Sequence, residues 1–174
     1  ETSPVATANL PGTLEFNGSI GYPLPSTEIS IRDDDGNALP AGSVGEICVR
    51  GPQVMRGYWN RPEETAQVML PGGWLRTGDI GRMDHHGRTY IEDRKKDMIL
   101  VSGFNVYPNE VEGVVAQMPG VLEVAAVAQP DEKSGEVVAL FIVRKDPTLT
   151  SEQVIAFCKR ELTGYKVPRY VYLR

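Results

Sequence analysis

The two residues with the clearest chemical potential are Asp79 and Arg94, which lie fifteen positions apart on either side of a predicted hairpin turn. A carboxylate can accept hydrogen bonds from both hydroxyls of a ribose, and a guanidinium suits the oxygens of a ribose or a phosphate. A hairpin of this length would bring the two side chains together. The spacing indicates either a nucleotide contact or a structural ion pair, and it does not decide between them.

Asp79 ends the sequence Thr77-Gly78-Asp79, where the glycine lets a backbone and a ligand approach closely. Taken alone, this short motif favours another role, an aspartate that hydrogen-bonds to the backbone of its own turn. The neighbouring His85 and His86 do not suggest a metal site, because adjacent side chains on a strand point to opposite faces. We therefore predict an exposed turn at the two histidines.

Composition and motifs exclude several classes of protein. The chain has 174 residues and a net charge of −5, which argues against a nucleic-acid partner. No apolar run is long enough to span a membrane, and no secretory signal pattern is present. Cys48 and Cys158 are too few for a disulfide framework, so we predict two reduced thiols and a cytoplasmic location. Neither common glycine-rich phosphate-binding pattern occurs.

The elements that must position Asp79 and Arg94 are mostly strands. Residues 12–91 carry short alternating stretches separated by turn residues, a pattern typical of a small barrel or sandwich. One helix is predicted over Glu63–Leu70, with acidic residues in its first turn. A hairpin turn is predicted at residues 84–87.

The second part of the chain alternates between helix and strand. After a strand hairpin, we predict a helix from Pro108, two strands, a helix with Thr150 or Ser151 as N-cap and Gly164 as C-cap, and a last strand. The predicted fold class is mixed α/β, with a β-rich distorted-barrel subdomain followed by a small α+β domain. The boundary falls in the charged run Asp93–Asp97, which is either an exposed linker or only a solvated turn.

Several stretches taken together are far more specific than any one of them. In chain order they are ETSP, GSIGYPLP, GEICVRGPQVMRGYWNRPEET, GGWLRTGDIG, DRKKDMILVSGFNVYPNEVE and LTGYKVPR. The set resembles the carboxyl-terminal part of the acyl-adenylate-forming (AMP-binding) enzymes, which include acyl-CoA synthetases, luciferases and peptide-synthetase adenylation domains. Within this superfamily the stretches most resemble bacterial long-chain fatty acid–CoA ligases, and the resemblance covers essentially the whole chain.

The resemblance implies a reaction in two steps. The carboxylate of a fatty acid attacks the α-phosphate of ATP in the presence of Mg²⁺, which gives acyl-AMP and pyrophosphate. The thiol of coenzyme A then displaces AMP and forms the thioester. Between the steps the small carboxyl-terminal domain is expected to rotate relative to the large domain.

The resemblance also implies roles for individual residues in nucleotide and metal binding. Asp79 matches the carboxylate that holds both ribose hydroxyls, and Arg94 matches the residue that contacts ribose and phosphate. Ile91 matches an apolar neighbour of the nucleotide. Glu1 matches the glutamate that binds Mg²⁺ in the full-length enzyme.

Three further matches concern the change between the half-reactions. Lys96 matches the hinge position of the family. Ser102 and Gly103 match the turn that is brought to the active site for thioester formation, where a glycine leaves room for the pantetheine arm of coenzyme A.

The same resemblance predicts the domain organisation. Residues 1–93 should be the last part of a large amino-terminal domain, residues 94–96 the hinge, and residues 97–174 a truncated small α+β domain. The family's phosphate loop and adenylation lysine would lie outside this chain, so we expect the chain alone to be inactive. Two alternatives stay open, a ligase for a medium-chain, aryl or amino acid and a non-catalytic binding protein on the same fold. Peripheral contact with the inner membrane and a homodimer also stay open.

Overall fold

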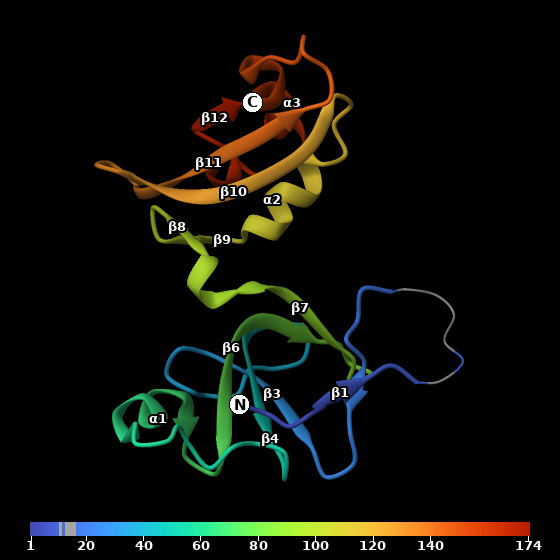
Figure 1. Cartoon of the computed structure of the whole chain (residues 1–174), viewed down its shortest axis with the longest axis vertical. Coiled ribbons are helices and arrows are strands. Elements are labelled where there is room, and N and C mark those ends of the chain that lie inside the picture. Colours follow the sequence, from blue (N-terminus) through green and yellow to red (C-terminus); the bar gives the residue numbers. More distant parts are fainter. Residues whose placement is uncertain (11, 13–16) are drawn as a thin grey trace. The chain divides into compact units, whose positions relative to one another are not determined.

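The chain folds into two compact units, Glu1–Lys95 and Lys96–Arg174. The structure is a computed structural model that describes residues 1–10, 12 and 17–174 (Figure 1). Each unit has a β-sheet of its own. The mixed α/β fold class predicted from the sequence is confirmed, and the barrel-like sheet is a curled half-barrel.

The sheet of the first unit is built from five antiparallel strands. They are β3 (Glu28–Arg32), β4 (Val44–Arg50), β5 (Met69–Leu70), β6 (Trp74–Met83) and β7 (Thr89–Arg94). Their order is β3-β4-β6-β5, and β7 pairs with the second part of β6. Two short strands, β1 (Thr7–Ala8) and β2 (Tyr22–Pro23), pair with each other.

The predicted hairpin joins β6 to β7 through a turn that Asp84 stabilises. Its carboxylate accepts hydrogen bonds from the backbone amides of His86 and Arg88, both at 2.9 Å. The side chains of His85 and His86 are exposed, as the sequence predicts.

The helix predicted over Glu63–Leu70 is shorter than expected. Helix α1 spans Pro62–Val68, and Met69 and Leu70 form β5. The physical reason is competition between helix and sheet: these two apolar residues pair with the start of β6. Tertiary pairing there overrides the local helical pattern.

The second unit has five strands and two α-helices. They are β8 (Ile99–Val101), β9 (Phe104–Val106), α2 (Pro108–Val115), β10 (Val121–Asp131), β11 (Gly135–Arg144), α3 (Ser151–Glu161) and β12 (Tyr170–Leu173). The sheet order is β10-β11-β8-β9, and β12 pairs in parallel with β11. This is the predicted order of a hairpin, helix, two strands, helix and strand.

The core of the second unit lies between its sheet and its helices. Residues of α2, α3 and β11 share one core cluster, which includes the fully buried Val111, Val115, Leu140, Val154 and Cys158. Such burial stabilises the folded state by roughly 25 cal/mol per Å² of apolar surface removed from water. Among the helices that the structure describes, none has the length and apolar composition that a membrane span needs.

Of the two predicted ends of α3, the N-cap is confirmed and the C-cap is wrong. Thr150 is the N-cap and forms a capping box with Gln153, which selects one of the two candidates. Gly164 is not the C-cap: α3 ends at Glu161 with Leu162 as its C-cap, and Gly164 begins a short 3₁₀ turn over Gly164–Lys166. Gly164 lies two residues beyond the observed C-cap, so the prediction from the glycine placed the end of the helix too late.

The two cysteines lie in the cores of different units. Cys48 is in β4 and Cys158 in α3, and both are free, fully buried thiols. Burial raises the pKa of each thiol to about 11.

We therefore expect both thiols to react slowly with an aromatic disulfide reagent near pH 8. Only about one thousandth of a thiol with that pKa is ionised there, and the thiolate is the reactive form. Both thiols should react quickly once denaturant exposes them. Fast reaction of either thiol in the folded protein, followed by absorbance, would contradict this packing.

Candidate functional site

Asp79 lies in a bulge of β6. Three residues of β6, Thr77 to Asp79, stand opposite a single residue of β4, Ile47. Gly78, in the middle of the bulge, has a φ of +75°, a left-handed conformation that favours glycine. The bulge therefore displaces Asp79 from the regular ladder with β4.

Hydrogen bonds hold this bulge in place. The Thr77 hydroxyl donates to the carbonyl of Ile47 at 2.8 Å and accepts from the amide of Asp79 at 3.1 Å. The amide of Gly78 donates to Oε1 of Glu46 at 3.2 Å. These contacts replace the ladder hydrogen bonds that the bulge interrupts.

Arg94 stands opposite Asp79 at the end of β7. The two residues are partners in the β6–β7 register, and the Arg94 Nε lies 3.8 Å from the Asp79 Oδ1. The Asp79 side chain is 34% exposed and the Arg94 side chain 66%. Burial raises the pKa of Asp79, while Arg94 lowers it and the Glu46 charge raises it further, with a net rise. The carboxylate thus sits in a partly desolvated place with one nearby cation.

A cavity of about 240 Å³ opens beside this pair. Its polar lining includes Glu1, Thr77 and Asp79, and Ile91 contributes to its apolar lining. The remaining lining is largely aliphatic, from Ile20, Ile29, Ile47, Val49 and Leu75. The first unit therefore brings Glu1, Asp79 and Ile91 to one cavity, with Arg94 paired to Asp79 next to it.

The Glu1 carboxylate accepts a hydrogen bond at Oε1 from the Tyr58 hydroxyl at 2.7 Å, and the Glu1 carbonyl accepts one from the Met55 amide at 2.8 Å. The second carboxylate oxygen has no contact of this kind with Tyr58. Mg²⁺ is commonly held by one or two carboxylates together with substrate phosphates. In the part of the chain that the structure describes, no three His, Cys, Asp or Glu side chains form a metal cluster. The Glu1 carboxylate is one oxygen group of the kind that Mg²⁺ takes.

The remaining candidate residues belong to the second unit. Lys96 is exposed in a 3₁₀ turn, η1 (Lys95–Asp97). Ser102 and Gly103 form the turn between β8 and β9, with φ values of +50° and +85°. A Cβ added to Gly103 would meet no other atom within 4 Å, so this turn is open.

The charged run Asp93–Asp97 is less exposed than a simple linker would be. Asp93 is only 4% exposed, and its Oδ1 accepts a hydrogen bond from the amide of Arg94 at 2.7 Å. The ammonium of Lys95 lies 2.7 Å from Asp34 and 3.1 Å from Glu46. The expectation of an exposed linker therefore fails for Asp93 and Lys95, because both are bound within the first unit.

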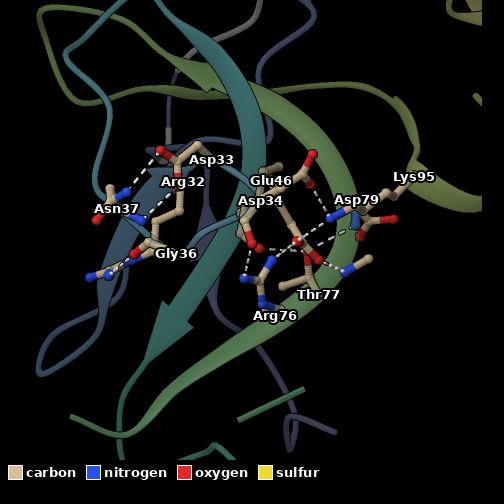
Figure 2. A network of polar contacts seen from close by, with 12 residues as sticks. Arg32, Asp33, Asp34, Gly36, Asn37, Glu46, Arg76, Thr77, Asp79 and Lys95 are labelled. Atoms are coloured by element: carbon tan, nitrogen blue, oxygen red, sulfur yellow. Dashed lines mark hydrogen bonds and ion pairs between the residues drawn. The ribbon is translucent and has the colours of Figure 1, made fainter. Parts of the chain in front are cut away.

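Sequence reasoning missed the polar network around Glu46, which Figure 2 shows. Glu46 accepts from Arg76 at 2.6 Å and from Lys95, while Arg76 also donates to the carbonyl of Asp34 at 2.8 Å. One signal was available: Glu46 directly precedes three apolar residues of the same strand, Ile47, Cys48 and Val49. Its partners Arg76 and Lys95 could not be inferred from the sequence, because they lie 30 and 49 positions away.

Comparison with known families gives two matches along the chain. The sequence model of the AMP-binding enzyme family matches residues 1–59. The model of the AMP-binding enzyme C-terminal domain matches residues 110–174. The two matches lie in different parts of the chain and together cover well over half of it.

Individual relatives match the whole chain. It is 57% identical to a long-chain-fatty-acid–CoA ligase of Escherichia coli over 100% of its own length and 31% of that protein. An ATP-bound RpMatB-BxBclM chimera has a TM-score of 0.90 at 36% identity, over 97% of this chain and 34% of that one. An o-succinylbenzoate CoA synthetase of Bacillus subtilis, in complex with its acyl-adenylate intermediate, has a TM-score of 0.81 at 38% identity, over 90% and 32%. The chain thus spans about a third of the length of these relatives.

The raised pKa of Asp79 leads to a prediction on stability. A charged Asp79 opposes folding above its folded-state pKa, and this effect disappears as the pH falls through that value towards the ordinary 3.8. Asp79→Asn should therefore raise the melting temperature relative to wild type near pH 7, and the gain should shrink near pH 3. Thermal unfolding at both pH values checks this.

Asp33 offers a matched control with the opposite sign. Hydrogen bonds from Asn37 lower the pKa of Asp33, so its charge favours folding at neutral pH. Asp33→Asn should lower the melting temperature near pH 7. If Asp79→Asn lowered the melting temperature as Asp33→Asn does, the sign assigned to Asp79 would be wrong.

Proposed function

Because the chain belongs to the AMP-binding enzyme family, we propose that it is the carboxyl-terminal part of an ATP-dependent, AMP-forming ligase that joins a long-chain fatty acid to coenzyme A. The observation that carries this proposal is the likeness along the whole chain to proteins named long-chain-fatty-acid–CoA ligases. The cavity beside Asp79 supports it, because its polar and apolar groups suit one side of a nucleoside.

The proposed reaction has two half-reactions. A carboxylate oxygen of the fatty acid forms a bond to the α-phosphorus of ATP, and pyrophosphate leaves with the bonding electron pair. The sulfur of coenzyme A then bonds to the acyl carbon, AMP leaves, and the thiol proton passes to solvent. In both steps this chain's own residues bind and orient the nucleotide rather than exchange atoms with it.

Asp79 and Arg94 would hold the ribose in both half-reactions. The Asp79 carboxylate is partly desolvated and open to the cavity, so two ribose hydroxyls could donate to its oxygens. Arg94 would keep this carboxylate charged and offer its other donors to ribose or phosphate oxygens. Ile91, which is 46% exposed, would contribute an apolar wall beside the nucleotide.

Glu1 would supply a carboxylate ligand to Mg²⁺, whose charge offsets that of the phosphates when it is bound. The hydrogen bond from Tyr58 would orient Glu1 for this role. A carboxylate that is oriented through one oxygen can offer the other to a cation that keeps several waters.

Lys96 would act as the hinge, and Ser102 with Gly103 would line the passage for pantetheine. Lys96 is the first residue of the second unit, which supports a change of direction at this point. The open space above Gly103 supports close approach of an extended ligand to the backbone.

The proposal is tested by measuring AMP formation in the full-length enzyme that carries this chain. The assay contains ATP, Mg²⁺, coenzyme A and one acid from a panel that runs from acetate to oleate and includes aryl and amino acids. Turnover that rises towards the long chains supports the proposal. Turnover with aryl or amino acids only would keep the adenylation chemistry and reject the fatty acid. No turnover with any acid would favour a non-catalytic binding protein.

A second prediction separates the two half-reactions at Gly103. Gly103→Ala places a methyl group in the open turn and forces alanine into a left-handed conformation, which costs about 1–2 kcal/mol. Adenylation, measured by pyrophosphate exchange, should change by about twofold or less. Thioester formation should fall by roughly tenfold to a hundredfold, because a small displacement of a reacting group has effects of this size.

Gly87→Ala is the matched control. Gly87 has a φ of +83°, and a Cβ there also meets nothing within 4 Å, so the local strain is the same. It lies in the β6–β7 turn, outside the proposed pantetheine passage. Equal losses in both variants would show that strain alone explains the effect at Gly103.

A further inference from the structure

Glu46 is a charged residue in the interior of the first unit. Its side chain is only 5% exposed, although it carries a carboxylate. Burial of an unpaired charge is strongly unfavourable, and a buried ion pair rarely stabilises more than an apolar pair of the same shape. Stability alone therefore gives a weak reason for a glutamate at this place in β4, and its contacts suggest another one.

Three donors converge on this carboxylate, the Gly78 amide and the side chains of Arg76 and Lys95, of which Figure 2 shows the last two. On β6, the Gly78 amide donates to Oε1 at 3.2 Å, one residue before Asp79. Directly after β7, the Lys95 ammonium lies 3.1 Å from Oε2, one residue after Arg94. A single carboxylate is thus bound to the neighbour of each member of the pair.

The third donor closes this arrangement. Arg76, at the start of the bulge, donates to Oε2 of Glu46 at 2.6 Å and to the carbonyl of Asp34 at 2.8 Å. Asp34 in turn accepts from Lys95 at 2.7 Å. Glu46, Arg76, Asp34 and Lys95 therefore form a closed loop of contacts around the bulge.

Lys95 is also the last residue of the first unit. Burial lowers the pKa of Lys95, but its contacts with Asp34 and Glu46 outweigh this effect, with a net rise. The side chain therefore stays charged at neutral pH and remains bound. The chain enters the second unit from a residue whose side chain is fixed.

We propose that Glu46 is a positioning residue, which uses one buried charge to fix both the bulge that presents Asp79 and the residue from which the hinge begins. This inference rests on the proposed function, because it assumes that Asp79 binds the ribose. Glu46 itself does not touch the substrate. Its loss should loosen the 77–79 bulge and the 95–97 turn together.

The test is Glu46→Gln in the full-length enzyme, a change that keeps the shape and removes the charge. One amide oxygen can still accept from Gly78, but the ion pairs with Arg76 and Lys95 are lost. We expect the Kd for AMP and the KM for ATP to rise about tenfold, since hydrogen bonds to charged groups contribute at this scale. The KM for the fatty acid should stay within about twofold of wild type.

Glu28→Gln is the matched control. Glu28 lies on the neighbouring strand β3 and makes two hydrogen bonds to Arg50, at 2.8 and 2.6 Å, but its side chain is 57% exposed. The same substitution there removes a surface ion pair, which contributes little. All kinetic constants should stay near those of wild type. An equal rise of the Kd for AMP in both variants would overturn the proposal.

Backbone hydrogen exchange gives a readout that does not depend on activity. In Glu46→Gln, exchange should become faster over residues 76–79 and 95–97, with little change elsewhere in β4 and β6. Unchanged exchange in both segments would overturn the proposal, as would faster exchange with an unchanged Kd for AMP. If wild type did not bind AMP at all, the proposed function would fail, and exchange alone would decide on the positioning role.

A second variant keeps the test informative if Glu46→Gln does not fold. Lys95→Met leaves Glu46 bound to Arg76 and Gly78 and removes only the contacts at the hinge. Exchange should then become faster over residues 95–97 and stay unchanged over 76–79. We expect thioester formation to fall more than adenylation. Equal loss of both half-reactions would overturn the part of the proposal that concerns the hinge.

Discussion

The pairing of β6 is the constraint on which the first unit depends. This ten-residue strand is hydrogen-bonded to β4, β5 and β7, so it fixes the position of every other strand in the sheet except β3, which β4 holds. Asp79 lies in its middle, at the place where the ladder with β4 is interrupted. The same strand therefore supports the sheet through its regular pairing and carries Asp79 of the candidate site in its bulge.

The charges around the cavity suit some ligand groups better than others. Glu1 and Asp79 line it as carboxylates, and Glu46 lies just behind the bulge. Carboxylates accept hydrogen bonds from hydroxyls and bind cations, but they repel phosphates. Arg94 is the nearest opposite charge to Asp79. The charges that line this cavity therefore suit hydroxyl donors and cations better than phosphates.

Local signals in the sequence predicted the elements well and the long-range contacts poorly. Turn residues and alternation predicted the β6–β7 hairpin, and the Thr150–Gln153 spacing was compatible with the observed capping box. The juxtaposition of Asp79 and Arg94 followed from that hairpin. Composition could not reveal that Asp93 is buried, because burial of a charge depends on partners distant in the sequence.

The same limit applies to Glu46 and Lys95. A run of five charged residues has the composition of a solvated linker. Only the folded sheet shows that Asp93 and Lys95 are bound within the first unit. The shift from α1 to β5 at Met69 has the same origin, since pairing with β6 outweighs local propensity. Sequence patterns therefore identify which segments carry chemistry, while tertiary pairing decides which side chains serve it.

The anchoring of Lys95 has a mechanical consequence for the chain that follows it. Only residues 96–98 lie between this fixed lysine and the first residue of β8. With two soft dihedral angles per residue, about six torsions must absorb any reorientation between the units. The 3₁₀ turn η1 there has weaker hydrogen-bond geometry than an α-helix. Any reorientation across this short segment would therefore be confined to a few discrete backbone states.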